Sequence, residues 1–183
     1  MSNTFKDYIL QPNDQLMGLT QLVNGFDQNG QACEINVVEE QPLTIFLNGQ
    51  EIVTAMTIGD YPQYLALGFL KNQGMLTDNE NILGIDYDDE LQTVVVRTDG
   101  KTIYEEKLKK KTRTSGCAVG TVFGDMMEGL ENLKLPNAEF KVSWLYELSN
   151  IINQTPSLYL KAGAIHGTVL CCKNKPLVYM EDV

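Results

Sequence analysis

Cys117 is the residue of this chain whose surroundings most suggest chemistry. Five of the 14 basic residues stand within seven positions shortly before it: Lys107, Lys109, Lys110, Lys111 and Arg113. The small residues around Cys117 predict a loop that leads into a helix. Fixed positive charge and a helix N-terminus both stabilise thiolate, the reactive form of cysteine. The pattern predicts a reactive thiol, although a buried structural cysteine beside a solvated basic loop would give the same sequence.

The only histidine, His166, stands in a glycine-rich stretch after a predicted helix. An imidazole can donate a hydrogen bond to a phosphate or orient a sulfur species. A hydrogen-bonded structural histidine fits the same position equally well. The remaining thiols carry less information: Cys171 and Cys172 point to opposite faces of a predicted strand, and Cys33 receives no role. The four cysteines show neither a disulfide framework nor zinc-type spacing, so no metal site is expected.

The bulk properties narrow the classes of partner. The chain has 183 residues and a formal net charge of −10. Such acidity opposes binding to nucleic acid, which needs basic surface, and docking on anionic membranes. No apolar run approaches the roughly 20 residues that span a bilayer, and the start lacks the features of a signal peptide. We therefore expect a soluble cytoplasmic protein.

We predict that residues 1 to about 112 form a β-rich part. Alternating residues on both sides of Asn48-Gly49 predict a hairpin, because both turn positions need positive φ. A helix is predicted from Asp60 to Gly74. Two further hairpins are predicted, with turns at residues 88–90 and 99–100.

The second half changes to helical spacing. Apolar residues recur on one helical face: Val122, Phe123, Met126, Met127, Leu130 and Leu133. A second helix is predicted over residues 142–153, with Leu145, Leu148 and Ile152 inside. Two short strands, 168–171 and 177–180, close the chain. Because Glu181-Asp182-Val183 follows a strand directly, we expect the sequence to stop inside a larger protein.

Four segments in order resemble the formate dehydrogenase accessory protein family of the FdhD type. They are Glu39-Glu40-Gln41-Pro42-Leu43 with Leu47-Asn48-Gly49, Leu65-Ala66-Leu67-Gly68-Phe69-Leu70 with Gly74, Arg113-Thr114-Ser115-Gly116-Cys117, and Ala162-Gly163-Ala164-Ile165-His166-Gly167 with Glu181-Asp182-Val183. The resemblance implies an α+β fold in which residues 113–183 begin a cytidine-deaminase-like α/β core. It also implies that Cys117 matches the persulfide cysteine and His166 the family's histidine.

The family's activity is sulfur transfer, which would make this chain a sulfurtransferase. Its members accept sulfur from a cysteine desulfurase and pass it to the guanine dinucleotide form of the molybdenum cofactor, for formate dehydrogenase. The basic residues Lys109, Lys110 and Arg113 would then favour an anionic persulfide and the phosphates of the cofactor. A homodimer is a further possibility.

The chain departs from the family at two places. Gly120 stands where the family loop carries the second cysteine of Cys-x-x-Cys, so a one-thiol carrier is expected. The family's Gly-Arg-His-Asn block and cofactor segment do not follow Val183. One alternative is a non-catalytic chaperone that binds the cofactor and the enzyme, and another is a nucleotide-binding module without redox chemistry. Deamination is not supported, because Thr168 replaces the required glutamate.

Overall fold

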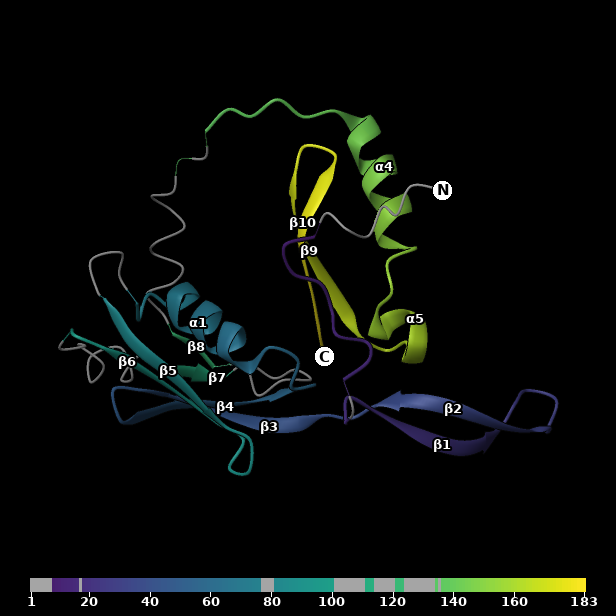
Figure 1. The fold of residues 1–183 in the computed structure, drawn as a ribbon, viewed down its shortest axis with the longest axis horizontal. Coiled ribbons are helices and arrows are strands. Elements are labelled where there is room, and N and C mark those ends of the chain that lie inside the picture. Colours follow the sequence, from purple (N-terminus) through teal and green to yellow (C-terminus); the bar gives the residue numbers. More distant parts are fainter. Residues whose placement is uncertain are drawn as a thin grey trace. The chain divides into compact units, whose positions relative to one another are not determined.

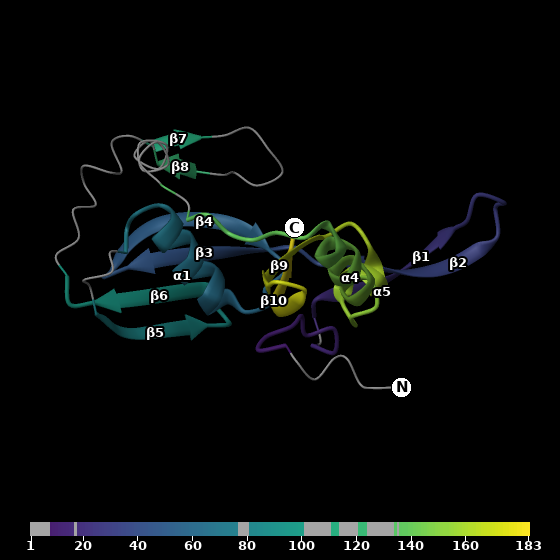
Figure 2. The same cartoon turned by 90° about the horizontal axis from the view of Figure 1, so that it is seen from above.

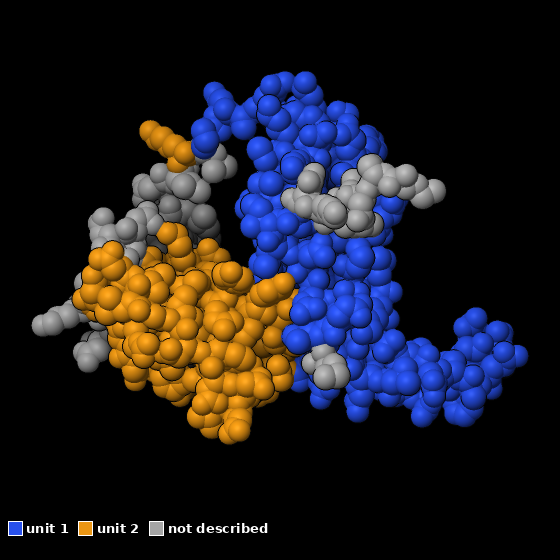
Figure 3. Space-filling model, in the orientation of Figure 1, with its two compact units in different colours: residues 1–40, 136–183 blue, residues 41–135 orange. Residues whose placement is uncertain are grey.

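A computed structural model describes residues 8–16, 18–76, 81–100, 111–113, 121–123, 134 and 136–183. The fold is a mixture of strands and a few helices, as expected for an α+β protein. The chain forms two compact units (Figure 3): residues 41–135 form one, and residues 1–40 join residues 136–183 in the other. The domain boundary near residue 112 stays a prediction.

The unit of residues 41–135 contains a four-stranded sheet, with strand order β4-β3-β6-β5. Its strands are β3 (Gln41–Leu47), β4 (Gln50–Thr57), β5 (Ile82–Asp88) and β6 (Thr93–Thr98). Strands β3 and β6 are parallel, and the other two pairs are antiparallel. Asn48 and Gly49 have φ of 49° and 85°, the positive values that the tight turn between β3 and β4 requires. Both predicted hairpins of this sheet are confirmed.

Helix α1 (Pro62–Asn72) covers one face of this sheet (Figure 1). Ala66 and Leu70 of α1 are fully buried against Leu43, Val94 and neighbouring strand residues. The helix ends at Asn72, and Gly74 just beyond it has φ of 64°, the left-handed conformation predicted to close the helix. The Met75 amide donates to the Leu70 carbonyl at 2.8 Å and closes the last turn. The start differs: Tyr61, with φ of 53°, stands at the N-cap, and Asp60 is buried beside it.

A short antiparallel pair follows in the sequence, β7 (Lys111–Arg113) with β8 (Thr121–Phe123). The prediction that Val122 and Phe123 begin a helical face is therefore wrong. β-branched and aromatic residues favour an extended backbone, and pairing with β7 stabilises it here. The rest of that predicted face, 126–133, and the hairpin predicted beyond Gly100 lie outside the described residues.

The other unit contains two antiparallel strand pairs and two helices (Figures 1 and 2). The elements are β1 (Thr20–Phe26), β2 (Ala32–Val38), α4 (Val142–Ile152), α5 (Leu158–Ala162), β9 (His166–Cys172) and β10 (Lys175–Asp182). Residues 8–10 run along β10, where the Ile9 amide donates to the Leu177 carbonyl at 2.8 Å. The helix and the closing hairpin predicted here are confirmed. Among the described residues, no helix is both long and apolar enough to cross a bilayer.

The apolar face of α4 is only partly covered. Leu148 is buried and Ile152 half-buried, as expected. Leu145 was expected inside, but 52% of its surface is exposed. Within this unit α4 packs chiefly on β10, so its neighbouring face has no core to enter among the described residues.

Candidate functional site

The predicted carrier residue and its cations are not placed by this structure. Cys117, Lys109 and Lys110 lie outside the described residues, and Arg113 is described only as the last backbone position of β7. In the sequence, Cys117 stands between β7 and β8. The expected helix is replaced by a strand at Thr121–Phe123, which removes the helix N-terminus at these residues from the argument for a thiolate. The nearby basic residues remain as the support for a thiolate at Cys117.

His166, the other predicted site residue, is the first residue of β9 and is exposed. In the β9–β10 register it stands opposite Asp182, and Gly167 stands opposite Glu181. Because successive side chains of a strand alternate between its faces, Glu181 and Asp182 point to different sides of β10. Asp182 lies at the strand end with His166, whereas Glu181 is directed into the interior of its unit.

The carboxylate of Glu181 has three hydrogen-bond donors around it. It accepts from the Leu158 amide at 2.7 Å, the Tyr159 amide at 3.2 Å and the Tyr179 hydroxyl at 2.9 Å. Only 4% of the Glu181 surface is exposed. Buried carboxylates are stable when such donors satisfy them. Glu181 therefore links the end of β10 to the start of α5.

Helix α5 starts here because its first amides find acceptors. Ser157, in extended conformation at the N-cap, accepts from the Leu160 amide at 3.3 Å. Glu181 accepts from the two preceding amides, which have no partner within the helix. A cap residue at Ser157 is visible in the sequence, but its partner Glu181 is 24 residues further along the chain and could not be predicted from local spacing.

Tyr179 completes this arrangement. Burial, reinforced by the neighbouring Glu181 carboxylate, raises the pKa of the Tyr179 phenol to about 12. Its ring lies against Gly167, where an added Cβ would stand 2.9 Å from the ring. The ring of Tyr8 lies 6.4 Å from that of Tyr179, and the Tyr8 and Thr155 hydroxyls are 3.1 Å apart. The strand that begins at His166 is thus packed at its second residue.

One residue of this arrangement can contact a ligand, and another holds the strand in position. His166 is exposed and can donate a hydrogen bond to an anionic ligand. Glu181 accepts hydrogen bonds from three internal donors, so its carboxylate positions the end of the strand. The sequence signal for Tyr179 was its spacing from Glu181, because residues two apart on a strand share one face.

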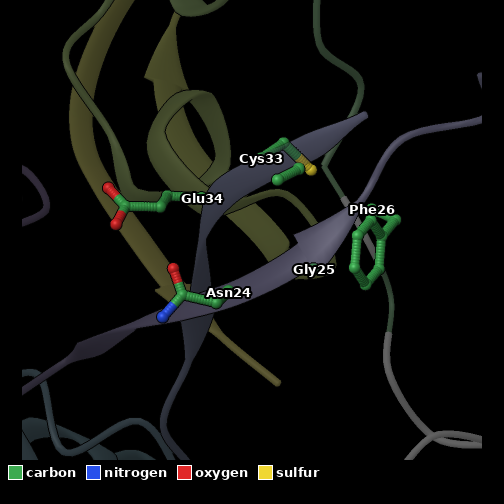
Figure 4. A pocket seen from close by; sticks show the side chains of 6 residues that line it. Asn24, Gly25, Phe26, Cys33 and Glu34 are labelled. Atoms are coloured by element: carbon green, nitrogen blue, oxygen red, sulfur yellow. The ribbon is translucent and has the colours of Figure 1, made fainter. Parts of the chain in front are cut away.

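The other thiols are in unlike environments. Cys171 is half-buried, its thiol donates to the Val169 carbonyl at 3.7 Å, and burial raises its pKa. Cys172 is exposed, so the expected difference between the two faces is confirmed. Cys33 lines an open pocket of about 490 Å³ at the outer end of the β1–β2 hairpin (Figure 4). No group of three metal-ligating side chains occurs in the described part of the chain.

Comparison with known proteins shows which family this chain is similar to. The model of the FdhD/NarQ family matches residues 38–183. The chain is 25% identical to the sulfur carrier protein FdhD of Wolinella succinogenes, over 80% of this chain and 52% of the relative. It is 26% identical to the FdhD protein of Bacillus subtilis, over 82% of this chain and 58% of the relative. The chain thus spans little more than half the length of these relatives.

The fold is similar to that of a solved structure. The crystal structure of a candidate formate dehydrogenase accessory protein from Desulfotalea psychrophila superposes with a TM-score of 0.62 and 20% sequence identity. The match covers 89% of this chain and 61% of that one. At this identity the likeness concerns the fold alone. The cytidine-deaminase-like core stays a prediction.

Proposed function

Because the chain belongs to the FdhD/NarQ family, we propose that it is a sulfur carrier that serves the maturation of formate dehydrogenase. The family match carries this proposal, because it runs from residue 38 to residue 183 and includes the position of Cys117. The curated relatives are named as sulfur carriers, which supports the same activity here. The presence of a cysteine beside five basic residues is what the chemistry requires of this chain itself.

Loading is an exchange between a thiolate and a persulfide. The Cys117 thiolate attacks the terminal sulfur of a persulfide on a cysteine desulfurase. A bond forms between the Cys117 sulfur and that terminal sulfur, and the sulfur–sulfur bond of the donor breaks. The desulfurase cysteine leaves as a thiolate, so the exchange needs no external oxidant or reductant. Basic residues near Cys117 favour the anionic attacking sulfur.

Delivery would place that sulfur on the molybdenum cofactor in its guanine dinucleotide form, which is the substrate of the transfer. Releasing the terminal sulfur as hydrosulfide needs two electrons. A second thiol can supply them by attacking the Cys117 sulfur, which leaves a disulfide between the two. In this proposal Lys109, Lys110 and Arg113 pair with the phosphates of the substrate. His166 donates one further hydrogen bond.

A labelled-sulfur assay tests the carrier function. A desulfurase supplied with sulfur-labelled cysteine is mixed with the parent chain, with Cys117→Ser and with Cys172→Ser. The exposed Cys172 is the matched control for loss of an accessible thiol. We expect label on the parent and on Cys172→Ser, and none on Cys117→Ser. Equal labelling of all three would remove Cys117 from the carrier role.

The same variants distinguish the chaperone alternative. If Cys117→Ser supports formate dehydrogenase activity in cells as well as the parent does, the chain acts by binding and not by sulfur transfer. A carrier predicts that Cys117→Ser fails in this assay and that Cys172→Ser succeeds.

A further inference from the structure

Three Asn–Gly pairs occur in this chain: Asn24-Gly25, Asn29-Gly30 and Asn48-Gly49. In such a pair the backbone nitrogen of the glycine can attack the side-chain carbonyl carbon of the asparagine, because glycine has no Cβ that would restrict the approach. The product is a cyclic imide, which water opens to aspartate or isoaspartate. Because the three pairs have the same two residues, the fold determines which of them reacts.

The side chain of Asn48 is held at both of its polar atoms. Its Oδ1 accepts from the Thr98 amide at 2.7 Å. Its Nδ2 donates to the Thr98 hydroxyl at 2.9 Å and to the Gly100 carbonyl at 3.3 Å. Ring closure requires the side-chain carbonyl to turn toward the next backbone nitrogen, which breaks these bonds. Each bond stabilises the unreactive arrangement, so the fold protects Asn48 from this reaction.

Asn24-Gly25 is protected by its strand. Both residues belong to β1 and pair with β2 in a continuous antiparallel register. The Asp27 amide donates to the Gln31 carbonyl at 2.9 Å, which marks a hydrogen-bonded pair at the end of this ladder. Such pairs alternate along antiparallel strands, so Gly25, two residues before Asp27, uses its amide in the ladder. The imide ring also needs a ψ outside the range of a strand.

Asn29-Gly30 differs from the other two pairs. Both residues are exposed and lie in the turn between β1 and β2. The Asn29 side chain makes one bond, from Nδ2 to Oδ2 of Asp27 at 3.4 Å, which is long for a hydrogen bond. In the described part of the chain, no donor reaches the Asn29 side-chain carbonyl oxygen. This side chain can therefore turn toward Gly30 at little cost.

One backbone bond opposes the reaction at this turn. The Gly30 amide donates to the Asp27 carbonyl at 3.0 Å. This bond closes an exposed turn, and such bonds open locally while the rest of the protein stays folded. Once it is open, the Gly30 nitrogen is available to attack the neighbouring side chain. Asn29 therefore needs only a local opening, whereas Asn24 needs its strand pairing to separate.

We propose that Asn29 is a site of spontaneous modification, at which the folded protein converts asparagine to aspartate and isoaspartate. The Gly30 nitrogen loses its proton and bonds to the side-chain carbonyl carbon of Asn29. The bond from that carbon to Nδ2 breaks, and ammonia leaves. Water then opens the imide at either of its two carbonyl carbons, so the conversion needs no oxidant and no enzyme.

The product changes the turn in two ways. Its new carboxylate lies close to that of Asp27, which accepts from the Asn29 and Gln31 amides at 2.9 and 2.8 Å, and two like charges repel at this distance. In isoaspartate the backbone is also one carbon longer, which disturbs these two bonds. A methyltransferase that acts on isoaspartyl carboxylates is the class of enzyme that would recognise this product.

The parent chain contains its own reference for the test. Incubation at mildly alkaline pH, with and without urea, is followed by peptide mapping in a mass spectrometer, which gives the rate at each Asn–Gly pair. In urea the three rates should be similar. In the folded protein Asn29 should keep most of its unfolded rate, whereas Asn24 and Asn48 should react at least about tenfold more slowly. An Asn29 that the fold protects as strongly as Asn48 would overturn the proposal.

A methylation assay identifies the product and its position. The aged parent is treated with an isoaspartyl methyltransferase and a labelled methyl donor, and it should take up label. Asn29→Gln should lose most of this label, because glutamine would have to close a larger ring. Asn24→Gln is the matched control on the same hairpin and should be labelled like the parent. Equal labelling of all three proteins, or no label on the aged parent, would refute the assignment to Asn29.

Discussion

The phenol of Tyr179 donates a 2.9 Å hydrogen bond to Oε1 of Glu181, two residues further along β10. Both side chains are buried, each with 4% of its surface exposed. Oε1 also receives the Tyr159 amide at 3.2 Å. The pair therefore joins β10, α5 and, through the Tyr179 ring, Gly167 of β9.

Removing the phenol should weaken the unit that carries His166. Tyr179→Phe leaves the Glu181 carboxylate with one donor fewer, and we expect it to lower the free energy of unfolding by about 1–3 kcal/mol. The single tryptophan, Trp144, belongs to α4 of the same unit, so its fluorescence in urea reports this change. The control is Tyr159→Phe, whose side chain is exposed and which should change stability by less than about 0.5 kcal/mol. Similar losses in both variants would contradict the role of the bond.

The same phenol predicts a loss of stability at high pH. Its pKa is raised to about 12 in the folded protein, above the ordinary value of 10.0. The folded state therefore holds the proton more tightly, and the stabilisation is complete below pH 10. It is lost as the pH rises toward 12. We expect unfolding followed by Trp144 fluorescence to become easier across this interval in the parent and to change less in Tyr179→Phe. Equal pH dependence in the two proteins would contradict the assignment.

A side chain at position 167 should destabilise the protein, because the ring of Tyr179 lies against Gly167. In Gly167→Ala the added Cβ would lie 2.9 Å from Cε2 of Tyr179, so the ring or the strand must shift. We expect a loss of about 1–3 kcal/mol in the free energy of unfolding, measured in urea. Gly25→Ala is a matched control on another strand of the same unit, because nothing lies within 4 Å of its Cβ position. If both variants unfold at the same urea concentration, the close approach is absent.

The cysteines should differ in rate of alkylation. Burial raises the pKa of the Cys171 thiol, so at neutral pH it should react more slowly than the exposed Cys172. Cys117 should be the fastest, because fixed positive charge stabilises its thiolate. A short iodoacetamide pulse followed by mass mapping gives the order. A Cys117 that reacts most slowly would refute the electrostatic argument, and a Cys171 as fast as Cys172 would refute the effect of burial.

Gly120 should determine how long sulfur stays on Cys117. With a second loop thiol, a neighbouring thiolate can attack the persulfide and release hydrosulfide. We expect the persulfide of the parent to persist without acceptor, and Gly120→Cys to shorten its lifetime. The mass increment of one sulfur, followed after loading, measures both. Equally fast loss from the parent would mean that another thiol resolves it, and Cys171→Ser and Cys172→Ser would then show which.

Local signals were sufficient for the elements of the four-stranded sheet. Asn48-Gly49 predicts its turn because few other residues accept positive φ at both positions. Gly74 likewise predicts the end of α1 through its left-handed conformation. The parallel pairing of Thr44 with Thr93 could not be predicted in this way. It depends on the packing of residues far apart in the sequence, for which a single sequence has no local signal.

Less of the candidate site than of the sheet could be predicted from the sequence. His166 was predicted as a site residue in a glycine-rich stretch after a helix, with the strand beginning at residue 168, whereas His166 itself begins β9. The capping of α5 by Glu181 was missed, because it joins residues 23 positions apart. Val122 was assigned to a helix because apolar spacing of three and four continues beyond it, whereas its own β-branched side chain favours the strand that forms.

The two units can fold at different times during synthesis. Residues 41–135 form one continuous unit, so this unit can fold as soon as it leaves the ribosome. The first 40 residues emerge earlier, yet their unit also needs residues 136–183. Ile9 and Leu10 find their backbone partners only when Leu177 and Tyr179 have been made. At ribosomal rates of roughly 5–20 residues per second, the N-terminal segment waits several seconds after the middle unit is complete. During that interval residues 8–40 are available to a chaperone that binds short apolar segments, because their partners on β10 have not yet been made.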